Sequence, residues 1–414
     1  MSSLLIRNIG LLVTSPDSQI KKGKNQGELL FLKDANILCE GERIATVGTG
    51  NDLPQADEVI DAQGCLVTPG LVDAHTHLVF GGWRQNEMAM KLAGAGYLDI
   101  LKAGGGILST VRSTRQASKE ELYDKAETAL DEMLKLGTTT CEAKSGYGLD
   151  LQEEVKQLEV IRELNERHVM DLIPTFLGAH AYPEEYKQDH ESYVQQICEE
   201  MIPYVAKHRL AQFCDVFCET GVFSVEESEK ILLKAQESGL KSKIHADEID
   251  AIGGSSLAGK IRAVSAEHLI VCNEEGIKAL SKGNVIACLL PATSLYLSAD
   301  FAKARAMIEN DVAIALGSDF NPGSCPCLNL QLVMTLACLK YRMRPEEVLN
   351  AVTINAAAAI DRNDRIGSLE AGKQADIVIW KAEDLNYLCY RLGSNLVSRV
   401  IKKGRVVYRN EETD

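Results

Sequence analysis

The chain has 414 residues, of which 45% are hydrophobic and 25% charged, a composition typical of globular proteins and unlike that of a disordered chain. Its length allows two or three ordinary domains, or one barrel of roughly 250 residues with a smaller accessory unit. The 59 acidic side chains outnumber the 44 basic ones, and the formal net charge of -15 repels phosphate backbones and anionic membranes. We therefore expect neither nucleic acid nor a membrane as a partner.

The N-terminal sequence and the spacing of the cysteines indicate where the protein is expected to reside and how its thiols are used. The N-terminus lacks a basic segment followed by a long apolar one, and no basic run adjoins an apolar stretch of 18 or more residues, so we expect a cytoplasmic protein. The twelve cysteines lack the paired spacing of a zinc ribbon, which favours reduced, buried thiols. Cys325 and Cys327 form the one local cluster, and packing explains it better than a structural metal site.

The first sixty residues contain short β-like segments separated by glycine and asparagine. These segments are Ser3 to Ile9, Glu28 to Leu38, Arg43 to Val47 and Glu58 to Asp61. The C-terminal end has similar segments at 375–380 and 397–408, and neither end shows a helical pattern. Because each end is too small to bury a core alone, we expect residues 1–66 and 367–414 to form one discontinuous β domain.

Between these ends, residues 67–366 alternate between short apolar runs and helical stretches, a pattern typical of βα units around a parallel sheet. The predicted strands are Leu71 to His77, Thr138 to Ala143, Leu172 to Ala179, Phe213 to Cys218, Lys243 to Ala246, Ser265 to Leu269, Val285 to Leu290 and Ile314 to Ser318. Ser118 and Glu121 form a capping box that opens a helix ending near Leu136, before Gly137. Eight such units predict a (β/α)8 TIM barrel, with its active site at the C-terminal ends of the strands.

Five of the eight histidines fall where predicted strands end, on the side where a barrel has its active site. They are His75, His77, His180, His245 and His268. The other three histidines lie in or beside polar helical segments. Because chance is a poor explanation for five imidazoles at one face, we interpret these five as residues of a functional site.

The spacing of His75 and His77 suits a metal ion, because the period of two in a strand turns both imidazoles to one face. For an isolated pair, a polar barrel lining is the better explanation. His245 and Asp319 end two other predicted strands and change this balance, since three imidazoles and one carboxylate suit zinc or iron. Such an ion lowers the pKa of a bound water and activates it for attack on a carbonyl carbon.

Proton transfer needs a further group, and Glu248 lies three residues after His245, just past the predicted strand. We predict that it is the general acid and base; a first-turn glutamate favoured by a helix dipole is the alternative. His268 is expected to face the same cavity, where it would polarise the carbonyl or orient the attacking water. It also remains an alternative ligand, and Asp319 counts among both the ligands and the catalytic residues.

Three other polar residues near these strand ends receive different interpretations. Lys144 would suit a carboxylated bridging ligand, but it follows the second predicted strand and not the fourth, so we expect a single metal ion. Glu219 ends the fourth predicted strand, where a second-metal ligand would lie, yet hydrogen bonding to its surroundings is the favoured role. Asp247 is interpreted as structural.

Several segments of the chain resemble the amidohydrolase superfamily, whose members are metal-dependent barrels with a flanking β-sandwich. Residues 67–77 (VTPGLVDAHTH) resemble its signature, and residues 367–376 (GSLEAGKQAD) resemble its return into the sandwich. Within the superfamily, the chain is most similar to the imidazolonepropionases, and this resemblance covers nearly the whole chain. Its specific segments are residues 75–84 (HTHLVFGGWR), 142–148 (EAKSGYG), 177–180 (LGAH), 245–248 (HADE) and 318–323 (SDFNPG).

The resemblance implies metal-dependent hydrolysis of the cyclic amide of 4-imidazolone-5-propanoate to N-formimidoyl-L-glutamate, a step of histidine degradation. It implies one Zn²⁺ or Fe³⁺ ion per subunit, a choice that the donor types leave open. The implied metal ligands are His75, His77, His245 and Asp319. The implied substrate and product contacts are Arg84, Tyr147, His180, Asn321, Gly323 and Ser324. The family also favours a homodimer.

Two of these contacts have a chemical rationale beside an ordinary alternative. Arg84 offers a planar fork that can bind a propionate carboxylate in a bidentate manner, although an arginine on a loop could equally be a surface charge. Tyr147 lies between two glycines in a loop that could bring its hydroxyl close to a ligand, although turn packing explains it equally well. Ser324 stands where threonine would be about as common, and Trp83 is larger than the residue usual in the family.

Two further functions remain as alternatives. A purine or pyrimidine deaminase of the same superfamily would share the ligand set and the HxxE segment, but a neutral nucleobase would give Arg84 no carboxylate to bind. A non-catalytic barrel that kept the fold for assembly would be expected to lose metal ligands, and no predicted ligand is missing from this sequence.

Overall fold

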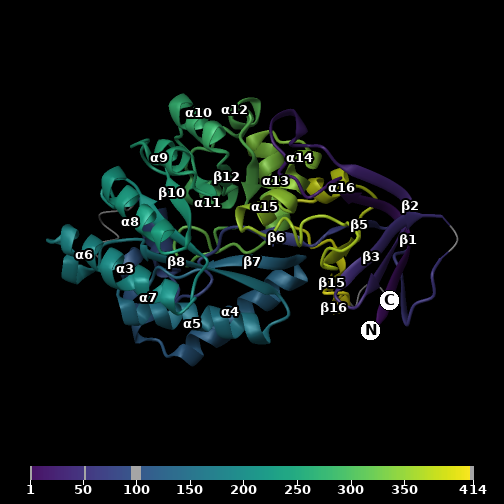
Figure 1. Cartoon of the computed structure of the whole chain (residues 1–414), viewed down its shortest axis with the longest axis horizontal. Coiled ribbons are helices and arrows are strands. Elements are labelled where there is room, and N and C mark those ends of the chain that lie inside the picture. The colour runs from purple at the N-terminus through teal and green to yellow at the C-terminus, as the bar shows by residue number, and fades with distance from the viewer. Residues whose placement is uncertain (1, 51–52, 95–103, 411–414) are drawn as a thin grey trace.

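The computed structural model describes residues 2–50, 53–94 and 104–410. Two eight-stranded sheets organise these residues, one in the middle of the chain and one built from both chain ends. Figure 1 shows the first sheet surrounded by helices and the second at the opposite end of the molecule, beside both termini. This arrangement confirms the predicted TIM barrel and the predicted pairing of the two chain ends.

The eight barrel strands are parallel, and their spatial order follows their order in the chain. They are β6 (Leu71–Asp73), β7 (Thr138–Lys144), β8 (Asp171–Ala179), β9 (Phe213–Cys218), β10 (Lys241–Ala246), β11 (Ser265–His268), β12 (Ile286–Leu289) and β13 (Ile314–Leu316). Each overlaps a predicted strand, and the largest difference is that β6 ends at Asp73 and not at His77. The reason is that β7 pairs with β6 only as far as Asp73, where Cys141 is its partner.

The barrel closes between β6 and β13 through the segments that follow these two strands. Thr76 and Phe320 form an isolated parallel bridge. The His77 amide donates to the Phe320 carbonyl at 2.9 Å, and the Asp319 amide donates to the His75 carbonyl at 3.0 Å. The closing seam therefore contains three of the four predicted metal ligands.

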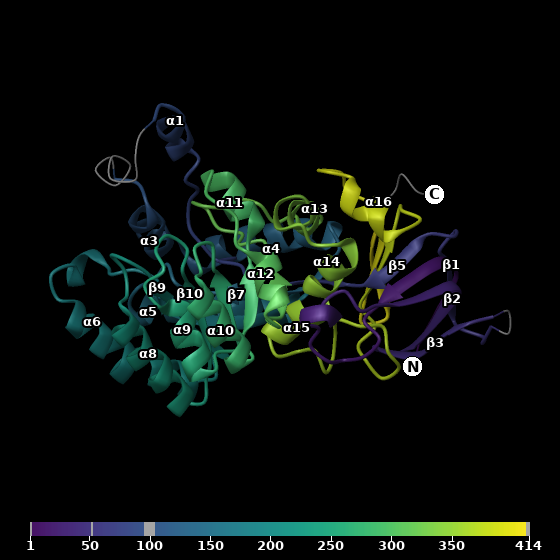
Figure 2. The ribbon, with the colours of Figure 1, turned by 90° about the horizontal axis from the view of Figure 1, so that it is seen from above.

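Helices fill the connections of the barrel and cover its outside (Figure 2). They are α1 (Asn86–Leu92), α3 (Ile107–Gln116), α4 (Lys119–Lys135), α5 (Leu151–Arg167), α6 (His190–Gln196), α7 (Ile202–Lys207), α8 (Val225–Glu237), α9 (Gly254–Ile261), α10 (Glu274–Gly283), α11 (Pro291–Leu297), α12 (Ala304–Glu309), α13 (Leu330–Tyr341), α14 (Pro345–Ala351) and α15 (Ile354–Ala359), with the short turns η2 (Glu184–Tyr186) and η3 (Ile197–Met201). Helix α4 confirms the predicted capping box, because the Ser118 and Glu121 side chains each accept the other residue's amide. Gly137 follows it with a φ of 97°.

The chain-end sheet has the strand order β16-β15-β14-β5-β1-β2-β3, and β4 pairs with β1. Its strands are β1 (Ser3–Thr14), β2 (Leu30–Glu40), β3 (Arg43–Thr49), β4 (Glu58–Asp61), β5 (Leu66–Pro69), β14 (Ile377–Trp380), β15 (Val397–Lys402) and β16 (Arg405–Arg409), with the turn η1 (Gly23–Asn25) between β1 and β2. β5 joins the two chain ends, since it runs parallel to β1 and antiparallel to β14.

The expectation that both ends lack helices is wrong for the C-terminal end, which contains α16 (Leu385–Tyr390). Six residues make fewer than two turns, too few to show a periodic pattern. The helix depends on a cap and on tertiary burial. The Asp384 side chain accepts the Tyr387 amide, and Leu388 is buried.

Charged side chains connect the barrel to the chain-end sheet. Asp171, the first residue of β8, lies 2.7 Å from the ammonium groups of both Lys402 and Lys403. Lys402 is almost fully buried and also lies 2.7 Å from Asp376. Because a buried ammonium needs such partners, these contacts orient the two sheets relative to each other.

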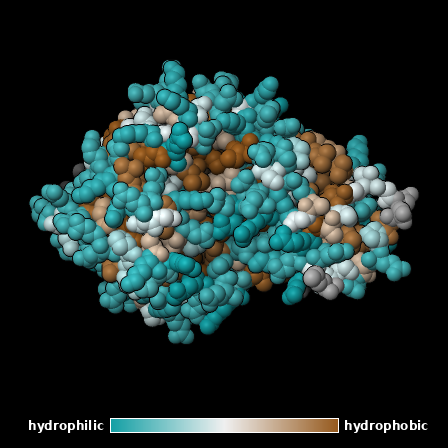
Figure 3. Space-filling model, viewed as in Figure 1, coloured by the Kyte–Doolittle hydropathy of each residue, from teal (hydrophilic) through white to brown (hydrophobic). Residues whose placement is uncertain are grey.

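The surface and the thiols agree with the composition. Hydrophilic side chains cover most of the face in Figure 3, and hydrophobic ones gather in smaller patches. All twelve cysteines are free thiols and nine are buried, as the sequence predicted. Among the described residues, no helix is both long enough and apolar enough to cross a lipid bilayer.

Candidate metal-dependent active site

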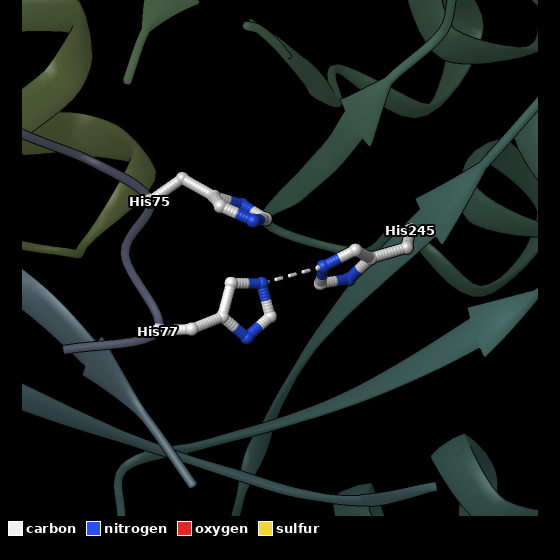
Figure 4. Close-up of side chains that lie close together, drawn as sticks. All are labelled: His75, His77 and His245. Atoms are coloured by element: carbon white, nitrogen blue, oxygen red, sulfur yellow. Dashed lines mark hydrogen bonds between the residues drawn. The ribbon is translucent and has the colours of Figure 1, made fainter. Parts of the chain in front are cut away.

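Three histidines and one aspartate from three strand ends meet at the mouth of the barrel. His75 and His77 follow β6, His245 lies in β10, and the three imidazoles point toward one another (Figure 4). The Nε2 atoms of His77 and His245 are 3.4 Å apart. The Oδ1 atom of Asp319, which follows β13, lies 3.5 Å from Nε2 of both His75 and His77. All four side chains are buried.

The unpaired atoms of this cluster fit a metal ion. Nε2 of His75 and Oδ1 of Asp319 are buried and make no hydrogen bond with other described residues. Ligand atoms at about 2.1 Å from a tetrahedral ion lie roughly 3.4 Å from one another, which matches the separations in the cluster. Burial lowers the pKa of His75 and His77 well below the usual range, so both imidazoles are neutral, the form that binds metal ions.

His268, at the end of β11, lies beside the same cluster. Two overlapping groups of side chains have all their ligand atoms within 4.8 Å of one another. One is His75, His77 and His245; the other is His75, His268 and Asp319. His268 is therefore close enough to the cluster to act on a bound substrate or to serve as a ligand.

Two carboxylates that the sequence did not reveal contact the Nδ1 atoms of two of these histidines. Glu267 Oε2 lies 3.0 Å from Nδ1 of His75, and Asp215 Oδ2 lies 3.0 Å from Nδ1 of His245. Such contacts orient an imidazole and make it a stronger ligand. The Thr293 hydroxyl, also missed, donates to Oδ2 of Asp319 at 2.6 Å. For Asp215 the available signal was an acidic residue inside the otherwise apolar strand β9.

Lys144 is an ammonium group paired with two buried carboxylates. Its Nζ lies 2.8 Å from Glu142 and 2.8 Å from Asp215, and all three side chains are fully buried. Although burial alone would lower it, the pKa of Lys144 is raised, because Asp215 and Glu142 stabilise the charged form.

Glu248 lies in the loop after β10, with Oε2 3.7 Å from Nε2 of His268 and 14% of its side chain exposed. Burial raises the pKa of its carboxyl group to about 7. A carboxyl group with a pKa near neutrality suits general acid and base chemistry. The first-turn alternative is wrong, because α9 begins six residues later, at Gly254.

The backbone around Glu248 is held by Glu219, at the end of β9. The Glu219 carboxylate accepts the amides of Glu248 at 3.1 Å, Ile249 at 2.9 Å and Asp250 at 3.1 Å. Glu219 thus makes hydrogen bonds nearby, as the sequence analysis favoured. Asp247 accepts the Ser255 hydroxyl at 2.5 Å and so attaches this loop to α9.

Arg84 is largely buried and not a surface charge, with 17% of its side chain exposed. Its Nε and Nη2 atoms each donate to Glu87 at 2.9 Å. The guanidinium group lies against Gly323, because a Cβ atom there would be 2.0 Å from Nη1 of Arg84. Arg84 therefore lies directly beside the loop that follows Asp319.

Tyr147 and His180 lie beside His77. The His180 ring stacks on His77 with centroids 4.9 Å apart, and the Tyr147 ring lies 5.8 Å from His77 and 5.3 Å from His180. Tyr147 is buried beside these site residues, so packing within its own turn does not account for its position. The Glu154 carboxylate holds the Tyr147 loop by accepting three backbone amides, those of Gly146, Gly148 and Leu149.

Asn321 shapes the loop after Asp319 with its own side chain. Its Oδ1 atom accepts the amides of Gly323 at 2.8 Å and Ser324 at 2.7 Å, and its Nδ2 atom donates to the Asp319 carbonyl at 2.8 Å. These bonds are typical of an Asx turn. All the predicted site residues thus lie around one region of the barrel mouth, and the three other histidines lie in or beside α5, α6 and α7.

Comparisons with known proteins agree with this geometry. Residues 66–407 match the model of the amidohydrolase family. The chain is 51% identical to an imidazolonepropionase of Alkaliphilus metalliredigens strain QYMF, over 98% of each chain. It is 49% identical to an imidazolonepropionase of Bacillus cereus strain G9842, over 100% of this chain and 98% of the relative. Its fold resembles an atrazine chlorohydrolase from Arthrobacter aurescens TC1 complexed with zinc, with a TM-score of 0.74, 19% identity and coverage of 99% and 96%.

Proposed function

The chain belongs to the amidohydrolase family, and on that premise we propose that it is an enzyme that hydrolyses 4-imidazolone-5-propanoate to N-formimidoyl-L-glutamate. One observation carries the choice of substrate. A largely buried arginine, Arg84, lies beside the loop that follows the ligand Asp319, so a cation for a carboxylate adjoins the hydrolytic centre. The substrate combines a hydrolysable ring amide with a propionate and therefore needs both features.

The metal site comes first in the proposed chemistry. His75, His77, His245 and Asp319 would hold one Zn²⁺ or Fe³⁺ ion, and their unpaired atoms support this assignment. Such an ion lowers the pKa of a bound water and polarises a carbonyl oxygen. Asp215 and Glu267 keep two of the histidines oriented toward the ion.

Glu248 and His268 would handle protons and charge. In its carboxylate form, Glu248 accepts a proton from the attacking water and delivers it to the ring nitrogen as the carbon–nitrogen bond breaks. His268 lies beside the same ligand cluster. Burial lowers its pKa to about 3, so its imidazole is neutral. A neutral imidazole can donate an N–H hydrogen bond to the oxygen that gains negative charge.

Substrate binding would use the residues around the metal site. Glu87 occupies the Nε–Nη2 edge of Arg84, so the propionate would bind at another edge of the guanidinium group, and Gly323 leaves the space that this group occupies. Tyr147 and His180 flank the ring. Asn321 and Ser324, which shape the loop after Asp319, contact the product side.

The deciding experiment is a turnover assay on freshly prepared 4-imidazolone-5-propanoate, with zinc and iron measured on the same sample. We expect consumption of the imidazolone absorbance and about one ion per chain. Release of ammonia from guanine or cytosine without imidazolone turnover would instead favour the deaminase alternative. A folded chain that never carries a metal would favour the non-catalytic alternative.

The assembly and organisation of the chain are also proposals. The resemblance to imidazolonepropionases favours a homodimer, which light scattering at several protein concentrations tests. We propose a cytoplasmic location from the sequence, and fractionation of the source cells tests it. We keep the division into residues 1–66 with 367–414 and residues 67–366, which limited proteolysis tests.

A further inference from the structure

Beneath the metal site, five ionisable side chains form a fully buried cluster inside the barrel, which we call the charge cluster. Its members are Glu142 and Lys144 of β7, Asp215 of β9, Lys243 of β10 and Glu267 of β11. Three carboxylates face two ammonium groups. Because these side chains come from four different strands, no single βα unit contains the cluster.

Glu142 lies at the centre of the charge cluster. Its Oε1 atom is 2.8 Å from Nζ of Lys144 and 3.0 Å from Nζ of Lys243, and it accepts the Thr175 hydroxyl at 2.6 Å. It touches none of the four metal ligands in any contact the structure shows among the described residues. The side chain of Glu142 therefore reaches the ligand histidines through the two lysines that it contacts, while its backbone carbonyl separately accepts the Thr76 hydroxyl at 2.6 Å.

Each lysine leads to a different ligand histidine. Lys144 lies 2.8 Å from Asp215, whose Oδ2 atom lies 3.0 Å from Nδ1 of His245. Lys243 lies 3.5 Å from Oε1 of Glu267, whose Oε2 atom lies 3.0 Å from Nδ1 of His75. Two arms of alternating charge thus connect Glu142 to two different ligand histidines.

Stability alone is a weak explanation for this arrangement. Buried ion pairs seldom stabilise a fold more than apolar residues of similar size, because desolvation offsets their attraction. Beneath a bound cation, however, these charges can stabilise the ion and orient its ligands. Three negative and two positive groups leave one negative charge there, and the lysines fix the carboxylates that orient the imidazoles.

We propose that Glu142 is a positioning residue that sets the orientation of both His75 and His245, and so the metal affinity, through the two lysine–carboxylate arms. This inference rests on the proposed function only in assuming that the ligand set binds a metal. Without the Glu142 charge, Lys144 and Lys243 would interact more strongly with Asp215 and Glu267. The carboxylates would then hold the imidazoles less firmly, and the site would be less negative.

The test measures Zn²⁺ affinity of the metal-free full chain by competition with a chromogenic chelator. Glu142→Gln keeps the side-chain volume and removes one charge, and we expect affinity to fall by roughly 10- to 100-fold, the range typical for groups that orient ligands. The matched control is Glu347→Gln. Glu347 lies in α14 and is a buried carboxylate that pairs with Arg305 and Arg344. We expect this control to lose stability but to keep its Zn²⁺ affinity.

A second variant guards against a failure of Glu142→Gln to fold. Thr175→Val removes the hydroxyl that donates to Glu142 without changing the charge. We expect a smaller loss of Zn²⁺ affinity, of a few fold, and a modest loss of stability of the metal-free chain, because a buried carboxylate loses one hydrogen bond. Unaltered Zn²⁺ affinity in a folded Glu142→Gln chain, or in Thr175→Val if the first does not fold, would overturn the proposal. An unsubstituted chain that binds Zn²⁺ but leaves imidazolone intact would refute the proposed function alone.

Discussion

Replacing Gly323 with alanine tests whether the position of Arg84 controls substrate binding. An added Cβ atom would lie 2.0 Å from Nη1, 2.4 Å from Cζ and 3.0 Å from Nη2 of Arg84. Non-bonded heavy atoms normally approach to about 3.5 Å, so the guanidinium group must move by more than roughly 1 Å. Gly323 does not have a left-handed φ, and alanine therefore fits the backbone there.

The expected effect falls on binding and not on folding. The obstructing atoms are the end of a flexible side chain, which can swing away at the cost of its two hydrogen bonds to Glu87. A charge-assisted hydrogen bond is worth about 1.5–3 kcal/mol, and each 1.4 kcal/mol is about tenfold in binding. We therefore expect KM for 4-imidazolone-5-propanoate to rise by roughly 10- to 100-fold, with kcat much less affected.

Steady-state kinetics on the imidazolone absorbance measures this effect, with thermal unfolding measured in parallel. The matched control is Gly48→Ala, because a Cβ at Gly48 meets no atom within 4 Å and its φ is not left-handed. We expect the control to keep both kinetic constants. If Gly323→Ala also kept the original KM, the assignment of Arg84 as the propionate-binding cation would be wrong.

Three further substitutions address proton transfer, loop position and the joint between the sheets. Burial raises the pKa of Glu248 to about 7. Because the carboxylate form accepts the proton, kcat/KM should rise as the pH passes through that value. Glu248→Gln should lower kcat by about 10²- to 10⁴-fold, and its pH–rate profile should lack this rise. Glu219→Gln should lower kcat at unchanged metal content and speed amide hydrogen exchange in residues 248–250, and unchanged exchange would contradict the positioning role. Burial alone would raise the pKa of Asp171, but Lys402 and Lys403 lower it from 3.8 to about 2. The stabilisation that the ionised Asp171 gives the fold is thus complete above about pH 4 and is lost as the pH falls toward 2. Asp171→Asn should therefore lower the free energy of unfolding, measured in urea, by about 2 kcal/mol at pH 7 and by less at pH 3.

Residues that follow a local period were predictable from the sequence. The apolar runs of the barrel reappear as eight parallel strands, and β9 has the same bounds as its prediction, Phe213–Cys218. The five clustered histidines were found because each follows a run of strand residues, and all parallel strands present their C-terminal ends to one face. The local pattern was enough to place these histidines, because the position of a residue along its own strand decides whether it lies at the C-terminal end of the barrel.

Residues whose role depends on a partner from another strand were not predictable in this way. Asp215 and Glu267 are single acidic residues within buried strands, and only the closed barrel brings them to His245 and His75. The short helix α16 was missed because its six residues depend on a cap and on burial against neighbouring elements.

The sequence by itself determined the βα repeat, the ends of the strands and the chemical types of the metal ligands, because these follow from backbone periodicity and from short segments of the chain. The tertiary structure alone decided that the barrel closes between the segments after β6 and β13, and that Glu142 lies beneath two ligand histidines at once. The physical reason is that strand alternation specifies which face a side chain occupies, whereas the stagger of eight strands around a closed barrel sets which side chains share a layer.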